Sequence, residues 1–205
     1  MTNRFLAVIG LALMTLTLSA QTQTQKKKFI DGYDGGMMVH SGFLSGTINP
    51  VGYKAKGLPM GIGGAIRFHI TEHFRFGTEG YVSTLNQSND TVEDGSYIKY
   101  GWGGLMGDFY WEKGRFMPYV GLTVGGGSQT SYLMYEGDKH DWLPEISTIY
   151  NKTGFLAVDP YVGCDYIVSK AFHLTLKMDC LCAFSKGEMV MPTGPRLYLG
   201  FIFFH

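Results

Sequence analysis

The final segment of the chain alternates between two kinds of position. Its odd-numbered positions are all apolar: Leu197, Leu199, Phe201 and Phe203. The even-numbered positions are mixed and begin with Arg196. Because successive side chains of a β-strand point to opposite faces, this pattern predicts a strand with one wholly apolar face. Such a face suits a sheet whose outer surface meets lipid rather than water.

The same alternation recurs along the chain between turn-like interruptions. Strands are expected at 33–45, 58–70, 74–85, 97–111, 115–128, 154–168, 172–184 and 195–205. The connections between them run long, short, long, short, long, short, long, as in barrels that cross a membrane. The sequence therefore predicts an all-β fold, an eight-stranded antiparallel up-and-down transmembrane β-barrel.

Composition agrees with strands and excludes several classes of protein. Aromatic residues make up 15% of the chain, glycines number 29, and charged residues make up only 17%. This mixture favours strands and tight bends, and it is too apolar for a disordered chain. Lysine and arginine together number 17, as do aspartate and glutamate, so no nucleic-acid partner is expected.

The N-terminus has the pattern of an export signal. Arg4 precedes an uncharged run over 5–18, and a cleavage site is expected at Ala20. We therefore divide the chain into a signal peptide (1–20), a flexible leader (21–28) and a barrel domain (29–205). An uncleaved anchor helix is the alternative interpretation of the first segment, which is short for a membrane-spanning helix.

On most of the expected strands, the charged side chains alternate with the apolar ones and therefore lie on the opposite face. A single Arg or Lys facing hydrocarbon at the midplane costs about 2–4 kcal/mol, so this face is expected to line the lumen. The predicted lumen charges are Arg67, Arg75, Glu79, Asp108, Arg115, Asp159, Asp165, Lys177, Asp179 and Arg196. Five of each sign in a narrow lumen predict a self-neutralising ion-pair network that plugs the barrel. An open pore is the alternative.

The segment 97–111 breaks the parity rule. Ile98, Tyr100, Trp102 and Met106 share a parity with Asp108. A β-bulge near Gly103-Gly104 would restore the pattern and is the expectation here.

Aromatic residues gather towards both ends of the expected strands. The group at the short turns is Phe74, Phe76, Trp111, Phe116, Phe172 and Phe203, and the group at the long loops is Phe43, Tyr97, Phe155 and Phe184. Two such belts are expected where a barrel meets the two membrane interfaces.

The segments 197–205 and 61–68 resemble the small eight-stranded outer-membrane β-barrel proteins of Gram-negative bacteria, and the resemblance covers the chain after the signal. It implies a location in the cell outer membrane, contact with outer-membrane lipid, and recognition by the barrel-insertion machinery during assembly. The expected insertion signal is Phe201, Phe203, Phe204 and His205. The histidine departs from the family, whose members usually finish on an aromatic residue. Functions in such families include adhesion, envelope integrity, passage of small solutes and lipid enzymology.

No catalytic residue, metal site or cofactor is expected. His69 and His73 would lie about 13 Å apart on one strand, too far to share a metal. His40 and the adjacent Ser41 would point to opposite faces, so they do not form a nucleophile–base pair.

The three cysteines are expected to act as small apolar residues of a sheet face rather than as a disulfide framework, because their number is odd. They are Cys164, Cys180 and Cys182.

The connection 129–153 is the longest and is apolar for an exposed loop. Its candidate binding residues are Tyr132, Tyr135, Trp142 and Tyr150. Such a loop could contact an extracellular partner, or its ends could extend the flanking strands above the membrane.

The sequence thus predicts a non-enzymatic outer-membrane barrel with a plugged polar lumen and loops that bind a surface partner or ligand. A narrow porin-like channel for small or apolar solutes is the first alternative. A lipid-modifying membrane enzyme and a soluble secreted lipid-binding barrel are the others.

Overall fold

A computed structural model describes residues 32–48, 53–89, 92–136, 146–185 and 190–205. The expected signal peptide (1–20) and leader (21–28) lie outside the described residues. Among these residues, we find no helix that is long and apolar enough to cross a membrane.

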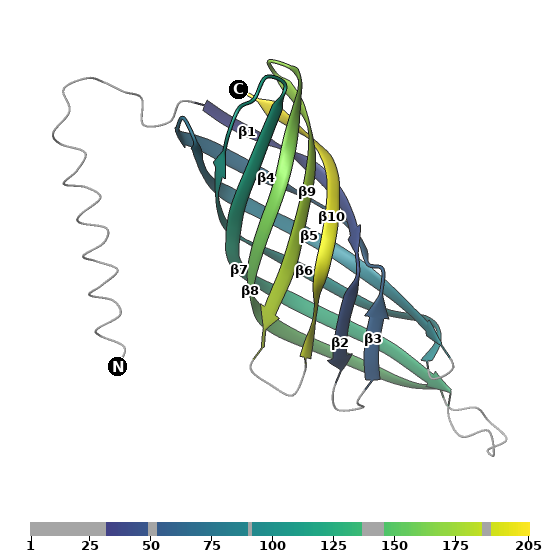
Figure 1. Cartoon of the computed structure of the whole chain (residues 1–205). Coiled ribbons are helices and arrows are strands. Elements are labelled where there is room, and N and C mark those ends of the chain that lie inside the picture. Colours follow the sequence, from purple (N-terminus) through teal and green to yellow (C-terminus); the bar gives the residue numbers. More distant parts are fainter. Residues whose placement is uncertain (1–31, 49–52, 90–91, 137–145, 186–189) are drawn as a thin grey trace, which may run out of the picture.

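The described chain consists of ten strands. They are β1 (Gly32–Gly42), β2 (Leu44–Ile48), β3 (Tyr53–Gly57), β4 (Met60–Thr71), β5 (Phe74–Asn89), β6 (Val92–Tyr110), β7 (Phe116–Glu136), β8 (Ile146–Ser169), β9 (Phe172–Phe184) and β10 (Val190–Phe204). β2 continues the path of β1, and β3 precedes β4 in the same way, so eight strands form the wall of an antiparallel barrel (Figure 1). The predicted fold class is confirmed.

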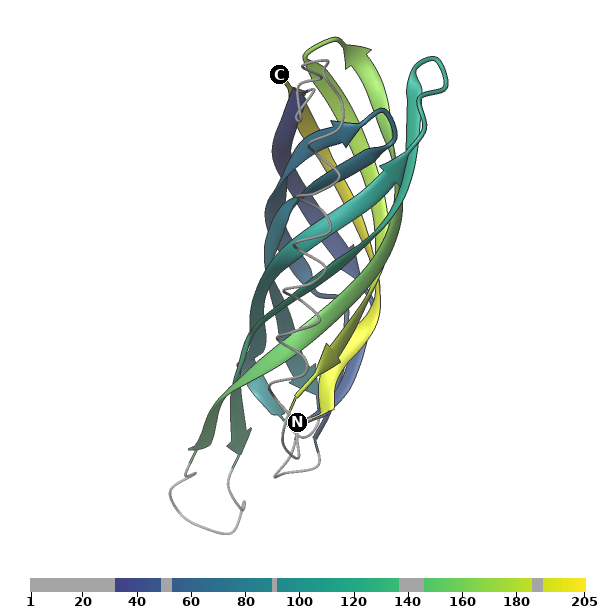
Figure 2. The same ribbon diagram turned by 90° about the vertical axis from the view of Figure 1, so that its left-hand side faces the viewer.

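Pairing between the first and last strands closes the barrel. The register of β1 and β10 runs from Asp34 opposite Phe204 to Gly42 opposite Arg196. Beyond it, the backbone N–H of Tyr33 donates to the carbonyl of His205 at 3.1 Å, and the N–H of His205 donates back at 2.9 Å. The short turns lie at this end, at the top of Figures 1 and 2, and the longer connections lie at the other.

The two faces of the wall differ as the parity rule requires. The outward apolar side chains are strongly exposed, for example Leu199 at 60% and Leu176 at 49%, whereas all the predicted lumen charges except Arg115 are 5% exposed or less. A strand in this wall therefore presents hydrocarbon outside and charge inside. One belt residue is an exception: Phe155 is 7% exposed and belongs to the lumen-facing set, so its assignment to the outer belt was wrong.

The predicted bulge in β6 is absent from the described strand. Its pairing with β5 is continuous from Phe109 to Ser96, and its pairing with β7 is continuous as well. The apolar set and Asp108 therefore face the lumen together. Trp102 is accommodated because the guanidinium of Arg196 lies 5.2 Å from its ring and Tyr81 packs at 5.8 Å. Because the Trp102 side chain fits inside the barrel, β6 needs no bulge to turn that side chain outward.

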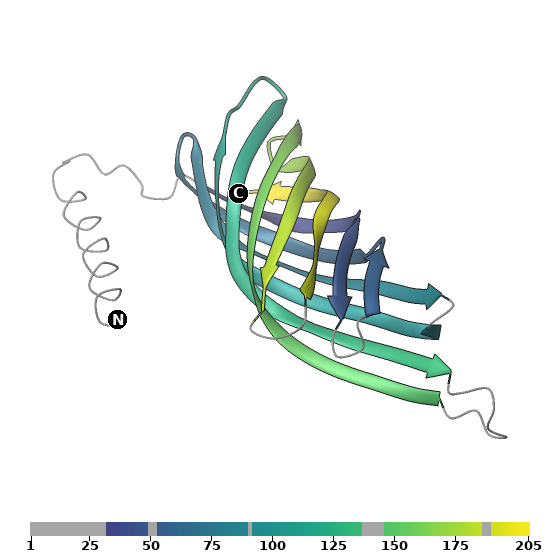
Figure 3. The same cartoon turned by 60° about the horizontal axis from the view of Figure 1, so that its bottom comes forward.

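The expected loop 129–153 is largely strand. β7 continues to Glu136 and β8 begins at Ile146, paired residue by residue. These two strands reach farther than their neighbours at the long-loop end (Figure 3). Of the two interpretations of this segment, the structure shows the extended strands.

Pro160 interrupts the ladder between β8 and β9. The pairing runs through Tyr161–Asp179 and resumes at Val158–Cys182, without the two positions between them. Proline lacks an N–H, so the carbonyl of Cys180 opposite it loses its backbone donor; the thiol of Cys182 donates to that carbonyl at 3.6 Å. The backbone groups of even-numbered residues of β8 therefore point towards β9, and the Ser185 hydroxyl accordingly donates to the carbonyl of Gly154.

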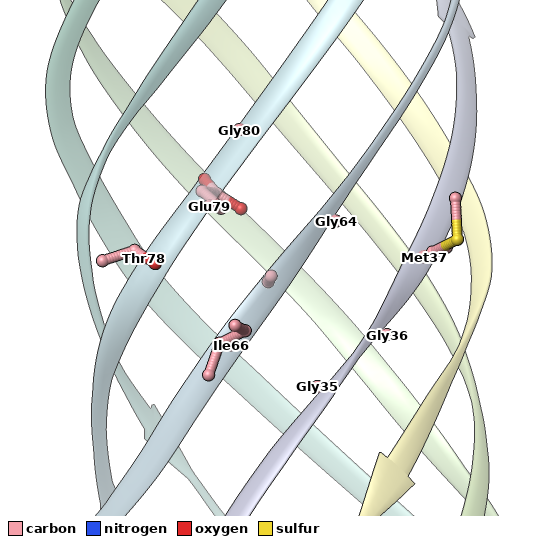
Figure 4. A pocket seen from close by; sticks show the side chains of 9 residues that line it. Gly35, Gly36, Met37, Gly64, Ile66, Thr78, Glu79 and Gly80 are labelled. Atoms are coloured by element: carbon pink, nitrogen blue, oxygen red, sulfur yellow. The ribbon is translucent and has the colours of Figure 1, made fainter.

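Glycines leave space on both the outer and the inner face of the barrel wall. On the outside, Gly64, Gly80, Gly103 and Gly126 stand in register on four adjacent strands. A shallow hollow of about 430 Å³ lies at the β1–β5 end of this row (Figure 4). On the inside, tyrosine rings lie against glycines of the neighbouring strand: Tyr161 covers Gly121, Tyr119 covers Gly163, and Tyr81 covers Gly63.

Replacing Gly163 by alanine is expected to destabilise the barrel, because the added methyl group would overlap the ring of Tyr119. We expect the free energy of unfolding to fall by about 1–3 kcal/mol, measured by urea titration in lipid vesicles. Gly154→Ala on the same strand is the control, because the nearest atom to its added Cβ is a carbonyl oxygen at 3.8 Å. Equal losses in the two variants would contradict the prediction.

Candidate functional site

The lumen near the short turns holds a cluster of paired charges. Arg67 donates to Asp34 at 2.6 Å and to Asp165 at 3.1 Å. Arg75 donates to Asp108 at 2.7 Å and to the same oxygen of Asp165 at 3.1 Å. One carboxylate thus bridges two guanidinium groups, and strands β1, β4, β5, β6 and β8 each contribute a charge. Because these groups are buried, breaking one pair would leave its partners without compensation.

His69 connects this cluster to the short-turn mouth. Its Nε2 lies 2.8 Å from a carboxylate oxygen of Asp34, and its Nδ1 lies 3.1 Å from the hydroxyl of Tyr110. Both ring nitrogens therefore have partners, and the imidazole is held in one orientation.

Lys177 occupies the middle of the lumen. Its ammonium group donates to Glu79 at 2.6 Å, and it lies 4.3 Å from the ring of Tyr161. Glu79 also accepts hydrogen bonds from Tyr81 at 2.9 Å and from Thr123 at 2.5 Å. The carboxylate and the aromatic rings together replace the water that the buried ammonium group loses, and the two hydroxyl groups satisfy the carboxylate.

Arg196 forms a further group of charge pairs on the long-loop side. Its guanidinium makes two hydrogen bonds to Asp179, at 2.7 and 2.9 Å, and one to Asp159 at 3.2 Å. A planar guanidinium suits this bidentate geometry, which a lysine could not reproduce.

The structure places most of the predicted lumen charges together. Those inside are Arg67, Arg75, Glu79, Asp108, Asp159, Asp165, Lys177, Asp179 and Arg196. Arg115 is a correction: β7 begins only at Phe116, and Arg115 follows Gly114 in the exposed turn, where the backbone has a φ of 66°. Its guanidinium therefore does not enter the lumen.

Sequence reasoning missed Asp34, which is 1% exposed and pairs with Arg67. The signal was its parity, shared with Met38 and His40 on β1. With Asp34 inside and Arg115 outside, the described lumen holds four cationic and six acidic side chains rather than five of each.

Apolar side chains close the lumen between the ion pairs and the long-loop end. Leu44, Leu85, Ile98 and Leu133 are at most 1% exposed at the long-loop end. Leu44 belongs to β2, in the β2–β3 hairpin, so this short hairpin helps to cap the barrel. No sequence pattern had indicated this apolar layer.

A serine–histidine contact lies in the lumen next to the apolar layer, on the side of the ion pairs. Nε2 of His40 is 2.5 Å from the hydroxyl of Ser83 on β5, and both residues are at most 4% exposed. A nucleophile and base of this kind need an acid that orients the imidazole. Nδ1 of His40 has no hydrogen-bond partner among the described residues, so the contact is a pair without the third group.

The described residues contain no group of three or more His, Cys, Asp or Glu arranged to hold a metal ion. All three cysteines are free.

The predicted loop residues have different outcomes. Tyr132 and Tyr150 stand in register on β7 and β8, and Tyr132 stacks on Tyr97 with ring centroids 5.4 Å apart. Tyr150 is 66% exposed, and Tyr135 lies within β7. Trp142 lies outside the described residues.

The residues of the predicted insertion signal lie along the closing seam. Phe201 and Phe203 face outward, with Phe203 47% exposed. Phe204 turns inward and packs against His69 at 4.7 Å, and His205 stacks on Tyr33 at 5.2 Å.

Comparison with solved structures finds matches over most of the chain. Neisserial surface protein A (NspA) matches with a TM-score of 0.55 and 14% identity, over 84% of this chain and 96% of that one. The attachment invasion locus protein Ail of Yersinia pestis gives a TM-score of 0.49 at 11% identity, over 84% and 98%. OprG of Pseudomonas aeruginosa gives 0.46 at 14% identity, over 83% and 96%. No family model and no curated protein matches the chain.

The closed eight-stranded wall, its apolar outer face and its charged interior define a small outer-membrane β-barrel.

Replacement of Arg75 by methionine is expected to lower the free energy of unfolding by about 3–5 kcal/mol, because Asp108 and Asp165 would lose a shared buried partner. Urea titration of the protein in lipid vesicles measures the change. Arg115→Met serves as the control and should unfold as the unmodified chain does. A large loss of unfolding free energy in Arg115→Met would show that Arg115 lies in the lumen and would contradict its placement in the turn.

Proposed function

We propose that the protein is a non-enzymatic outer-membrane barrel that displays a β-sheet edge for binding an extracellular protein. The observation that carries the proposal is the stretch 146–155 of β8. β9 pairs with β8 only from Leu156 onward, so within the described residues no strand covers this stretch on the side opposite β7. An uncovered strand edge presents a row of backbone donors and acceptors that another extended chain can pair with.

The backbone geometry identifies which groups face this edge. Even-numbered residues of β8 direct their N–H and C=O away from β7, as Pro160 and Gly154 indicate. Thr148 and Tyr150 therefore offer their backbone groups to a partner strand, and the exposed ring of Tyr150 lies beside them. Main-chain pairing would supply affinity, and Tyr132 and Tyr150, which stand in register on β7 and β8, would supply contact area.

The lumen supports a display role rather than transport. Its described side chains form three groups of ion pairs, around Asp165, Glu79 and Asp179, and apolar residues close the long-loop end. The buried contact between His40 and Ser83 offers no route for a lipid substrate. These observations favour a plugged scaffold over a channel or a lipid-modifying enzyme.

In planar bilayers, the purified protein is expected to give no stepwise conductance above that of the bare membrane, because paired side chains fill the lumen. A wide porin inserted under the same conditions shows that the assay detects channels. Reproducible small steps from this protein would instead support the narrow channel for small solutes.

The edge hypothesis predicts that Thr148→Pro abolishes partner binding by cells that display the protein, because proline removes an N–H that faces the edge. Thr148→Ala keeps that N–H and should bind as the unmodified protein does. Binding to a panel of purified serum and matrix proteins is measured by flow cytometry, with equal surface levels verified. The proposal fails if no panel member binds above cells lacking the protein, or if both variants bind equally.

A further inference from the structure

A second pocket opens at the short-turn mouth of the barrel, at the opposite end from the free edge of β8. It has a volume of about 390 Å³ and lies between the ends of β4, β6 and β10 and the turns that follow β4 and β6. In barrels of this class, short turns face the periplasm. The pocket therefore serves a different compartment from the proposed extracellular partner.

Backbone hydrogen bonds fix the turns and strand ends around the pocket. The N–H of Tyr110 donates to the carbonyl of His73 at 2.9 Å, which ties the first turn to β6. The N–H of Trp111 donates to the carbonyl of Pro118 at 3.0 Å, and that of Phe204 donates to Ala171 at 3.0 Å. A ligand would therefore find preformed walls rather than having to order them.

Aromatic rings form the walls. His69 packs at 4.7 Å from Phe204 and at 5.3 Å from Tyr110, and His73 lies 6.5 Å from Tyr110. Arg75 stands 4.8 Å from the Tyr110 ring, but its charge is matched by Asp108 and Asp165 in the network described above. The faces of Tyr110 and Phe204 attract organic cations, and the four rings together give an alkyl chain a surface to pack against.

Two carboxylates stand at the rim. Glu72 and Glu112 come from separate turns, both line the pocket, and no lysine or arginine lines it. Within the part of the chain that the structure describes, neither glutamate is joined to a cation by an ion pair. The lining of the pocket therefore carries two carboxylates, no lysine or arginine, and several aromatic rings.

This combination selects one kind of cation. A metal ion needs several ligand atoms that converge on one point, and the described residues provide no such group here. An alkylammonium ligand can instead place its carbon chain against the rings and its charged ends near separate carboxylates. We propose that this pocket binds a short alkyl diamine, with Glu72 and Glu112 each facing one ammonium group.

The test is titration of the full protein in nanodiscs of zwitterionic lipid, followed by backbone NMR and calorimetry. The probes are 1,4-diaminobutane, 1-aminobutane as the monocation, and 1,4-butanediol as the neutral analogue. We expect the diamine to bind more tightly than the monoamine and the diol not to bind. The largest shifts should fall on the turns at 71–73 and 111–115, and raised salt should weaken binding.

The variant Glu72→Gln with Glu112→Gln should weaken diamine binding about tenfold, because both exposed charge partners are lost. Lys170→Gln, in the third short turn, is the matched control and should leave the affinity unchanged. Equal binding of the diol, unchanged affinity in the double variant, or zinc chloride binding that displaces the diamine would each overturn the proposal. None of these outcomes depends on the β8 edge, so the two proposals stand or fall separately.

Discussion

Each strand of a membrane barrel has one face in hydrocarbon, and the cost of a bare charge there decides which way every strand faces. This single constraint sends Arg67, Arg75, Lys177 and Arg196 into a lumen where each is at most 3% exposed. Once inside, each cation must find carboxylates, because an isolated charge in a low dielectric is far more costly than a paired one. The ion-pair network follows from the membrane, and the plugged lumen follows from the network.

The parity of the sequence was sufficient to predict the eight strands and most of their lumen charges. Errors arose where parity gives no information. Arg115 has the lumen parity but lies in a turn, beyond the point where strand geometry applies. The bulge in β6 was predicted because the apolar side chains that share the parity of Trp102 were assumed to face lipid. The lumen around Trp102 is itself aromatic. Only the packed interior, with Arg196 against that indole, reveals this.

Partners across the barrel could not have been predicted from local sequence. Glu79 and Lys177 are 98 residues apart in the chain, as are Arg67 and Asp165. Which of several inward charges meet depends on the register and stagger of every strand between them. The same holds for His40 and Ser83, since the sequence suggested a test of the neighbouring Ser41 and not of a serine two strands away. The sequence left the extension of β7 and β8 open beside a partner-binding loop, because an apolar connection of this length is compatible with both. Function is less determined still, because one scaffold of this kind supports many activities.

The seam between β1 and β10 has a consequence for how the molecule comes into being. These strands are the first and last of the barrel, so we expect their pairing to form last, because it closes a longer stretch of chain than any other pair. Until then Arg196, carried by β10, is missing from the side of Asp159, and two open edges remain available to other chains. During assembly, the open barrel therefore has unpaired strand edges and incomplete ion pairs that need protection. The pairing of β10 with β1 completes the wall and the ion pairs of the lumen together.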